Sequence, residues 1–204
     1  MLAFGLVLGV GAAVTDAAWT DPEYASGTFK AGTFDIESAT DQSLATYTSH
    51  NTSAGAAVFT FDTASLPLST AMYPGSVVAS PWAIRAAAGS IAGTVTLAAA
   101  TLTSATNSFA TDLQYRVFWS MTNPNCTASS TSASNYLVGS ATTWGAMTST
   151  PTVPNPLPKL AAGASSTTAG APVYLCFQFT LPSTAANGDQ GLSASFTWAA
   201  NGST

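Results

Sequence analysis

The sequence predicts an all-β fold, an antiparallel β-sandwich or jelly roll, on three observations. In short runs such as residues 113–121 and 173–181, every second side chain is apolar. This alternation is expected for strands that have one face in a core and the other in water. Turn signals such as Tyr73-Pro74-Gly75 separate the runs, because proline presets φ and glycine supplies a positive φ. Lys and Glu are scarce in the 204 residues, which argues against long amphipathic helices.

The expected strands follow one another along the chain. They are residues 28–37, 56–62, 77–87, 93–102, 113–121, 173–181 and 192–198. Gly32 marks a bulge or a close approach of two backbones in the first, and Pro81 marks an edge or a bulge in the third. Alternation places Trp119 and Trp198 on inward faces, and Cys176 on the outer face of its strand.

Residues 19–204 are expected to form a single domain, which is a normal size for an all-β domain. An irregular excursion rich in Pro, Ser and Thr covers residues 122–172. Its stretch 150–158 holds four prolines and cannot be a central strand or a helix. The two cysteines, Cys126 and Cys176, are expected to form a disulfide in an exported chain, with two separate buried thiols as the alternative.

The chain opens on an uncharged apolar run, residues 2–14. It is shorter than the roughly 20 residues that cross a membrane and suits the core of a signal peptide. Small residues offer cleavage sites after Ala13, Ala17 or Ala18, so residues 1–18 are expected to be removed and the protein secreted. Only Met1 precedes the run, where a signal peptide carries Lys or Arg, which indicates a start upstream or an internal methionine. The alternative is a buried helix or strand of the fold.

Composition narrows the function classes. Charged residues are 6% of the chain, against about 25% in ordinary proteins, and the net charge is −5. The four Lys and Arg residues form no cluster, so no nucleic-acid partner is expected. Weak charge also permits self-association, because copies of the chain repel one another little.

The motifs of common enzymes are absent from the sequence. There is no G-x-S-x-G, no H-E-x-x-H and no Gly-rich phosphate loop, and the single histidine, His50, sits in a polar turn-like segment. We expect no catalytic residue, no metal site and no cofactor. Among the aromatic residues, Trp144 is the best candidate for an exposed ring that stacks on a sugar, whereas core packing is expected for Trp119 and Trp198.

Residues 17–37, AAWTDPEYASGTFKAGTFDIE, resemble the start of the mature region in the TasA/camelysin family. The matching residues are Trp19, Asp21, Phe29, Ala31, Gly32, Thr33, Phe34, Asp35 and Ile36. The turn at residues 73–75 and the closing strand 192–198 are also similar to that family. The resemblance implies a jelly-roll β-sandwich, export through a SipW-like signal peptidase, and a structural role at the cell surface or in biofilm matrix.

The resemblance also implies a mode of assembly. In fibres of that family, the segment freed by signal peptidase completes a sheet of the next subunit, which yields a head-to-tail filament. Here the assembly residues are expected within the N-terminal strand segment 19–37, and they are Trp19, Tyr24, Phe29, Gly32, Phe34 and Ile36. The expected partners are other copies of the chain, signal peptidase, and cell-wall or matrix components.

Other interpretations stay open at this point. Residues 28–36 would simply be the first strand of their own domain if the chain does not polymerise. A camelysin-like extracellular metallopeptidase and a monomeric carbohydrate-binding or adhesion module are the alternative functions.

Overall fold

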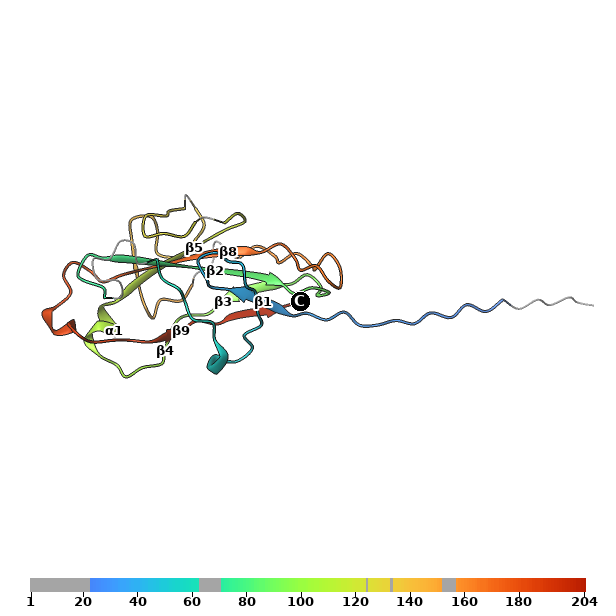
Figure 1. Ribbon diagram of the computed structural model, residues 1–204, viewed down its shortest axis with the longest axis horizontal. Coiled ribbons are helices and arrows are strands. Elements are labelled where there is room, and N and C mark those ends of the chain that lie inside the picture. Colours follow the sequence, from blue (N-terminus) through green and yellow to red (C-terminus); the bar gives the residue numbers. More distant parts are fainter. Residues whose placement is uncertain (1–22, 63–70, 124, 133, 152–156) are drawn as a thin grey trace, which may run out of the picture. The chain divides into compact units, whose positions relative to one another are not determined.

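The computed structural model describes residues 23–62, 71–123, 125–132, 134–151 and 157–204 (Figure 1). The chain divides into two units, Met1–Ala31 and Gly32–Thr204. In the first unit, the described residues 23–31 form no helix or strand, and all of them are exposed. The predicted signal peptide, residues 1–18, and Trp19 lie outside the described residues. No described helix is long and apolar enough to cross a membrane.

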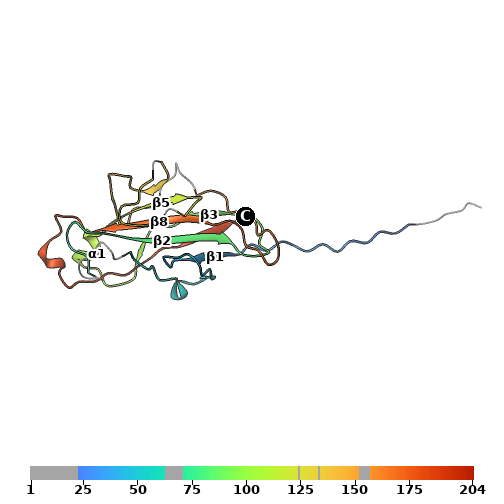
Figure 2. The same ribbon diagram turned by 45° about the horizontal axis from the view of Figure 1, so that its top comes forward.

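The second unit is built on a six-stranded antiparallel sheet, here called the main sheet. Its strands are β1 (Ile36–Ala39), β2 (Val77–Ala86), β8 (Val173–Thr180), β5 (Gln114–Ser120), β6 (Tyr136–Val138) and β7 (Gly145–Ala146). The order is β1-β2-β8-β5-β6, and β7 also pairs with β5. Figure 2 shows β5, β8, β2 and β1 lying side by side. The long pairings are Val77–Ile84 with Val173–Thr180 and Gln114–Ser120 with Tyr174–Thr180. The predicted all-β antiparallel fold is confirmed.

A two-stranded ribbon forms the second layer. In it, β3 (Thr94–Leu97) pairs with β10 (Ala200–Ser203), and β4 (Thr101–Leu102) pairs with β9 (Phe196–Thr197), both antiparallel. Two short helical turns, α1 (Ser108–Asp112) and η2 (Asn187–Asp189), lie in connections between the layers, and a third, η1 (Ser53–Gly55), lies between β1 and β2 of the main sheet. The side chains of Asn107 and Thr52 cap α1 and η1 by accepting backbone N–H groups. In Figure 1, β9 runs below the layer that holds β2, β8 and β5.

The main core lies between the inner face of the main sheet and this ribbon. Alternation on β5 and β8 sends one set of side chains inward, and Val95 and Leu97 of β3 meet them from the second layer. The inward set contains Leu113, Tyr115, Val117, Val173, Leu175, Phe177 and Phe179. Trp119 and Trp198 pack against this cluster, as the alternation predicts. The arrangement is that of a β-sandwich whose second layer, in the described residues, is much narrower than the first.

On the outer face of the main sheet, the excursion packs against β5 and β8, while Leu44 and Tyr47 pack against Ala39 and Ala83 of β1 and β2. Cys126 and Cys176 form a disulfide with a Cα–Cα distance of 5.3 Å, which confirms the predicted pairing. Ala79, Phe118 and Tyr136 pack around it. The excursion also adds strands β6 and β7 to the edge of β5. It is therefore part of the same body as the sheet, although its sequence is irregular.

Several expected strands differ in the structure. Residues 56–62 form no strand; their one ladder contact is the bridge between Asp62 and Ala79. Residues 28–37 contribute only the Thr33–Ser90 bridge and the start of β1 at Ile36. Of the predicted strand 192–198, only Phe196–Thr197 form a strand, β9, and a further strand that was not predicted, β10, follows at Ala200–Ser203. Pro81 lies in β2, and β1 pairs only with residues 83–86 of that strand. On the side of β2 that faces β1, Pro81 is therefore at an edge, where the missing N–H costs little.

Candidate functional site

A groove opens along one side of the sandwich. It is lined by residues 36–38, 40, 50–53, 56–61, 186–187 and 189–201 and by the inner face of the main sheet, where Val78, Trp82 and Phe179 contribute. Its volume is about 1360 Å³. Typical small-molecule pockets have roughly 300–1,000 Å³, so the groove has room for a longer ligand such as a peptide segment.

One wall of the groove is an unpaired strand edge. Among the described residues, β9 pairs only with β4 and β10 only with β3. Both strands border the groove, because residues 196–201 line it. An unpaired strand edge carries free backbone N–H and C=O groups, which makes it a template for another strand. The groove therefore joins an apolar floor to an edge that can accept main-chain hydrogen bonds.

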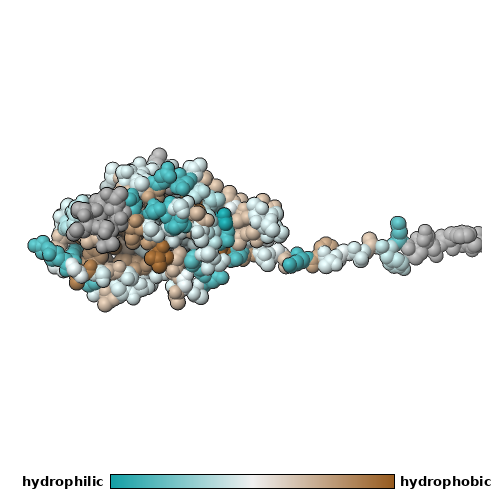
Figure 3. All heavy atoms as spheres, viewed as in Figure 1, coloured by the Kyte–Doolittle hydropathy of each residue, from teal (hydrophilic) through white to brown (hydrophobic). Residues whose placement is uncertain are grey.

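The mouth of the groove exposes large apolar side chains. Val58, Phe61 and Leu192 line the groove and have exposed fractions of 84%, 43% and 41%. Figure 3 shows apolar residues, drawn in brown, on the face where residues 50–61 run in Figure 1. Exposed apolar residues gathered at a concave site are typical of an interaction surface.

Among the buried polar groups of the groove that lack hydrogen-bond partners in the described residues are the indole N–H of Trp82 and both carboxylate oxygens of Asp189, a residue that is only 6% exposed. Asp189 sits in η2 near α1, at the end of the groove away from β10. Buried polar groups are normally paired. The groove therefore holds polar groups that the described residues leave unpaired.

The predicted assembly residues fall into two groups. Tyr24 and Phe29 belong to the first unit and are 91% and 96% exposed. Gly32, Phe34 and Ile36 belong to the second unit, where Gly32 is exposed and the side chains of Phe34 and Ile36 are half-buried. A Cβ on Gly32 would stand 2.7 Å from Ile91, and one on Gly202 would stand 2.7 Å from the Phe34 ring. Among the described residues, the exposed segment that another copy could bind is therefore residues 23–31.

The other candidate residues lie outside the groove or are occupied locally. Trp144 is half-buried, and the Arg116 guanidinium lies 4.3 Å from the centre of its ring. His50 borders the groove, but its two ring nitrogens are 2.8 Å from Thr48 Oγ1 and from the Gly55 carbonyl oxygen. No group of three or more His, Cys, Asp and Glu residues that could hold a metal occurs in the described parts of the chain.

The groove itself was not anticipated from the sequence. The alternation of residues 56–62 predicts a strand, and no local signal shows that a strand will lack a neighbour. In comparisons with known proteins, the chain matches no family model and no curated protein is significantly similar to it.

Proposed function

We propose that this protein is an extracellular structural subunit that assembles head to tail. Residues 23–31 of one copy add as a strand to the β9–β10 edge in the groove of the next copy. The observation that carries the proposal is the unpaired β9–β10 edge beside an apolar groove. Backbone hydrogen bonds along such an edge supply affinity, and pockets for alternate side chains supply specificity. Because the contact joins two different surfaces, repetition produces an open filament.

The segment 23–31 has the pattern of a strand that lacks a sheet. Alternation places its side chains on two distinct faces. One face carries Ala25, Gly27, Phe29 and Ala31, and the other carries Tyr24, Ser26, Thr28 and Lys30. All of these residues are exposed. The first face is apolar and mostly small, which suits a groove floored by apolar side chains, with Phe29 as its anchor.

The resemblance to the TasA/camelysin family supplies the setting of the proposal. It implies a jelly-roll sandwich, release by signal peptidase after residue 18, and a place at the cell surface or in biofilm matrix with wall or matrix components as further partners. The disulfide is compatible with an oxidising location outside the cell. Removal of the apolar N-terminal run would free the segment that we assign as the donor strand.

Negative-stain microscopy of the exported protein, purified from the medium, tests the proposal directly. We expect filaments from the exported chain. Deletion of residues 19–31, which removes the whole donor segment and its anchor Phe29, should abolish them and leave a folded monomer, since the second unit begins at Gly32. Filaments that persist unchanged in the deletion variant, or an exported chain that stays monomeric, would contradict the proposal.

A matched pair of substitutions tests which side chain anchors the segment. Phe29→Ala should weaken assembly by roughly 10- to 100-fold, the factor for burying one large apolar side chain. Tyr24→Ala should change it by less than about 3-fold, because Tyr24 lies on the opposite face. Both residues are over nine-tenths exposed, so neither change should alter the stability of the monomer. Equal effects of the two variants on the critical concentration would refute the assigned face.

A further inference from the structure

We infer that the groove is a gap one strand wide, and that residues 57–61 form its second pairing edge. An incoming strand would then be hydrogen-bonded on both sides, between residues 57–61 and the β9–β10 edge. This inference rests on the proposed function and extends it, because it assigns a second half to the acceptor site.

The first edge is defined by the direction of its backbone groups. The carbonyl of Ser195 accepts the N–H of Thr103, and the carbonyl of Ala199 accepts the N–H of Ala98, both at 2.8 Å. In an antiparallel ladder, successive residues direct their N–H and C=O groups to alternate sides of the strand. The groups directed away from β3 and β4, toward the groove, therefore belong to Phe196, Trp198 and Ala200.

The second edge follows from the same argument applied to residues 56–62. The carbonyl of Val58 accepts the Thr40 hydroxyl at 2.8 Å, and the N–H of Asp62 donates to the carbonyl of Ala79 at 2.7 Å. The carbonyl of Thr60 likewise accepts the side-chain amide of Gln42. The even-numbered residues thus direct their backbone groups toward the loop after β1 and toward β2. The residues that direct theirs to the other side are Ala57, Phe59 and Phe61, and all three line the groove.

None of these odd-numbered residues has a backbone hydrogen bond to another described residue. The segment therefore has the alternation of a strand and one bonded side, but no partner on the side that faces the groove. Residues 56–62 form no strand because their bonded side receives two side-chain donors and a single backbone bridge, and their other side has no backbone partner among the described residues.

The two edges meet below the gap through their side chains. The ring centroids of Phe59 and Trp198 are 5.4 Å apart, and Phe59 also lies 5.0 Å from Phe177 in the core. A strand laid between the edges would pass over this aromatic contact. Most of its inward side chains must therefore be small.

The segment that meets this requirement is residues 25–31 of a second copy. Its inward face would present Ala25, Gly27 and Ala31, with one large side chain, Phe29. Its other face would present Ser26, Thr28 and Lys30 to solvent. A central strand in this position would join the ribbon and residues 57–61 into one continuous second layer.

Hydrogen exchange on the assembled exported protein tests both edges separately. Backbone amides in peptides covering residues 57–61 and residues 196–200 should both exchange more slowly in filaments than in monomers. Protection of residues 196–200 alone would overturn the two-sided gap and leave the proposed function standing. Absence of any assembly would overturn the proposed function itself. Equal protection of both segments in the monomer would show that the chain's own residues fill the gap, and would overturn this inference.

Two neighbouring proline substitutions provide a matched test. Ala57→Pro removes an N–H that faces the gap, whereas Val58→Pro removes one that faces the other side. Ala57→Pro should raise the critical concentration for assembly by roughly 2- to 10-fold, the factor for one lost hydrogen bond. Val58→Pro should leave it within about 2-fold. Circular dichroism of the monomers checks that both variants fold, and equal critical concentrations for the two folded variants would overturn the assignment.

Discussion

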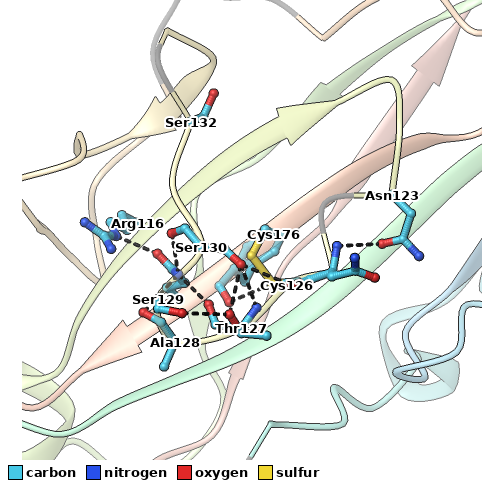
Figure 4. The surroundings of a disulfide bond; sticks show 12 residues. Arg116, Asn123, Cys126, Thr127, Ala128, Ser129, Ser130, Ser132 and Cys176 are labelled. Atoms are coloured by element: carbon cyan, nitrogen blue, oxygen red, sulfur yellow. Dashed lines mark hydrogen bonds between the residues drawn. A yellow bond between two sulfur atoms is a disulfide. The ribbon is translucent and has the colours of Figure 1, made fainter.

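On the outer face of the main sheet, the excursion is tied down by a disulfide and by buried, charge-assisted hydrogen bonds. Arg116 donates to Gln178 Oε1 at 2.6 Å and to the Ala141 carbonyl at 2.6 Å. The Gln178 amide donates to the carbonyls of Thr127 and Ser130 (Figure 4). On the groove side, by contrast, two strand edges have no partner among the described residues.

The difference indicates which side of the molecule is used for association. In both regions, segments without regular secondary structure pack against the sheet. On the outer face, the polar groups are hydrogen-bonded within the protein, whereas at the groove backbone groups of the strand edges face the groove without a partner among the described residues. Unpaired backbone groups are costly to bury without a partner and available to one that arrives. If this contrast is correct, changes on the outer face should reduce stability, while changes at the groove should act on assembly.

The largest effect on stability is expected from removing the disulfide. Replacing Cys126 and Cys176 by Ala releases a loop that spans a separation of 50 residues, which should lower the free energy of unfolding by about 4 kcal/mol. Urea unfolding of the two proteins measures the change. Adding reductant to the wild type should reproduce it and should leave the double variant unaffected. A loss below about 1 kcal/mol would show that the outer face is not held by this link.

The next largest effect is expected from Arg116→Met. Arg116 is only 7% exposed, and its loss leaves Gln178 and two backbone carbonyls without a donor, so we expect about 2–3 kcal/mol of destabilisation. Arg85→Met is the control, because Arg85 pairs with Glu37 at 2.6 Å at a partly exposed site, where a pair contributes about 1 kcal/mol or less. If Arg116→Met and Arg85→Met lower the free energy of unfolding in urea by similar amounts, the outer face is not held by the buried hydrogen bonds of Arg116.

Tyr115, an inward-facing residue of the core, ties the excursion to the sheet in a pH-dependent way. Its hydroxyl donates to the Ser149 carbonyl of the excursion at 2.7 Å, and burial raises the pKa of Tyr115 to about 12. The unfolded chain loses this proton near pH 10, while the folded protein keeps it, so stability should fall between about pH 10 and pH 12 by roughly 2 kcal/mol. Urea unfolding across that range should show the fall. In Tyr115→Phe, the free energy of unfolding should no longer show the part of this fall with pH that comes from the Tyr115 hydroxyl.

The smallest effect is expected at Asp189, on the groove side. Its carboxylate is buried without a hydrogen-bond partner among the described residues, so Asp189→Asn should raise stability by about 1 kcal/mol at neutral pH. Asp112→Asn, at a half-exposed position in α1, should leave stability nearly unchanged. Thermal unfolding measures both, and destabilisation by Asp189→Asn would mean that this carboxylate is satisfied.

Part of this architecture could be predicted from residue patterns. Strands β2, β5 and β8 lie within the predicted ranges, and Phe177 and Phe179 face inward as their spacing requires. The turn at Tyr73-Pro74-Gly75 forms with Gly75 at φ +87°, where the Ser76 N–H donates to the Tyr73 carbonyl. These features depend on a few neighbouring residues, so a local pattern is sufficient to determine them.

The candidate site was predicted less well. The exposed aromatic residues Tyr24 and Phe29 lie in the segment that the sequence singled out, but Phe34 packs against Gly202 inside the body. Nothing in the sequence distinguished residues 56–62 from a paired strand. Their role depends on which neighbour is missing, and that is a property of the whole sheet.

By itself, the sequence determined the all-β character, the inward and outward faces of the long strands, and the pairing of Cys126 with Cys176, because alternation and cysteine number are visible along the chain. Only the tertiary structure decided that the second layer is a narrow ribbon and that the edges at residues 57–61 and 196–200 face one groove. The physical reason is that strand pairing joins residues far apart in the chain. A vacant edge therefore exists only once every other strand has found its place.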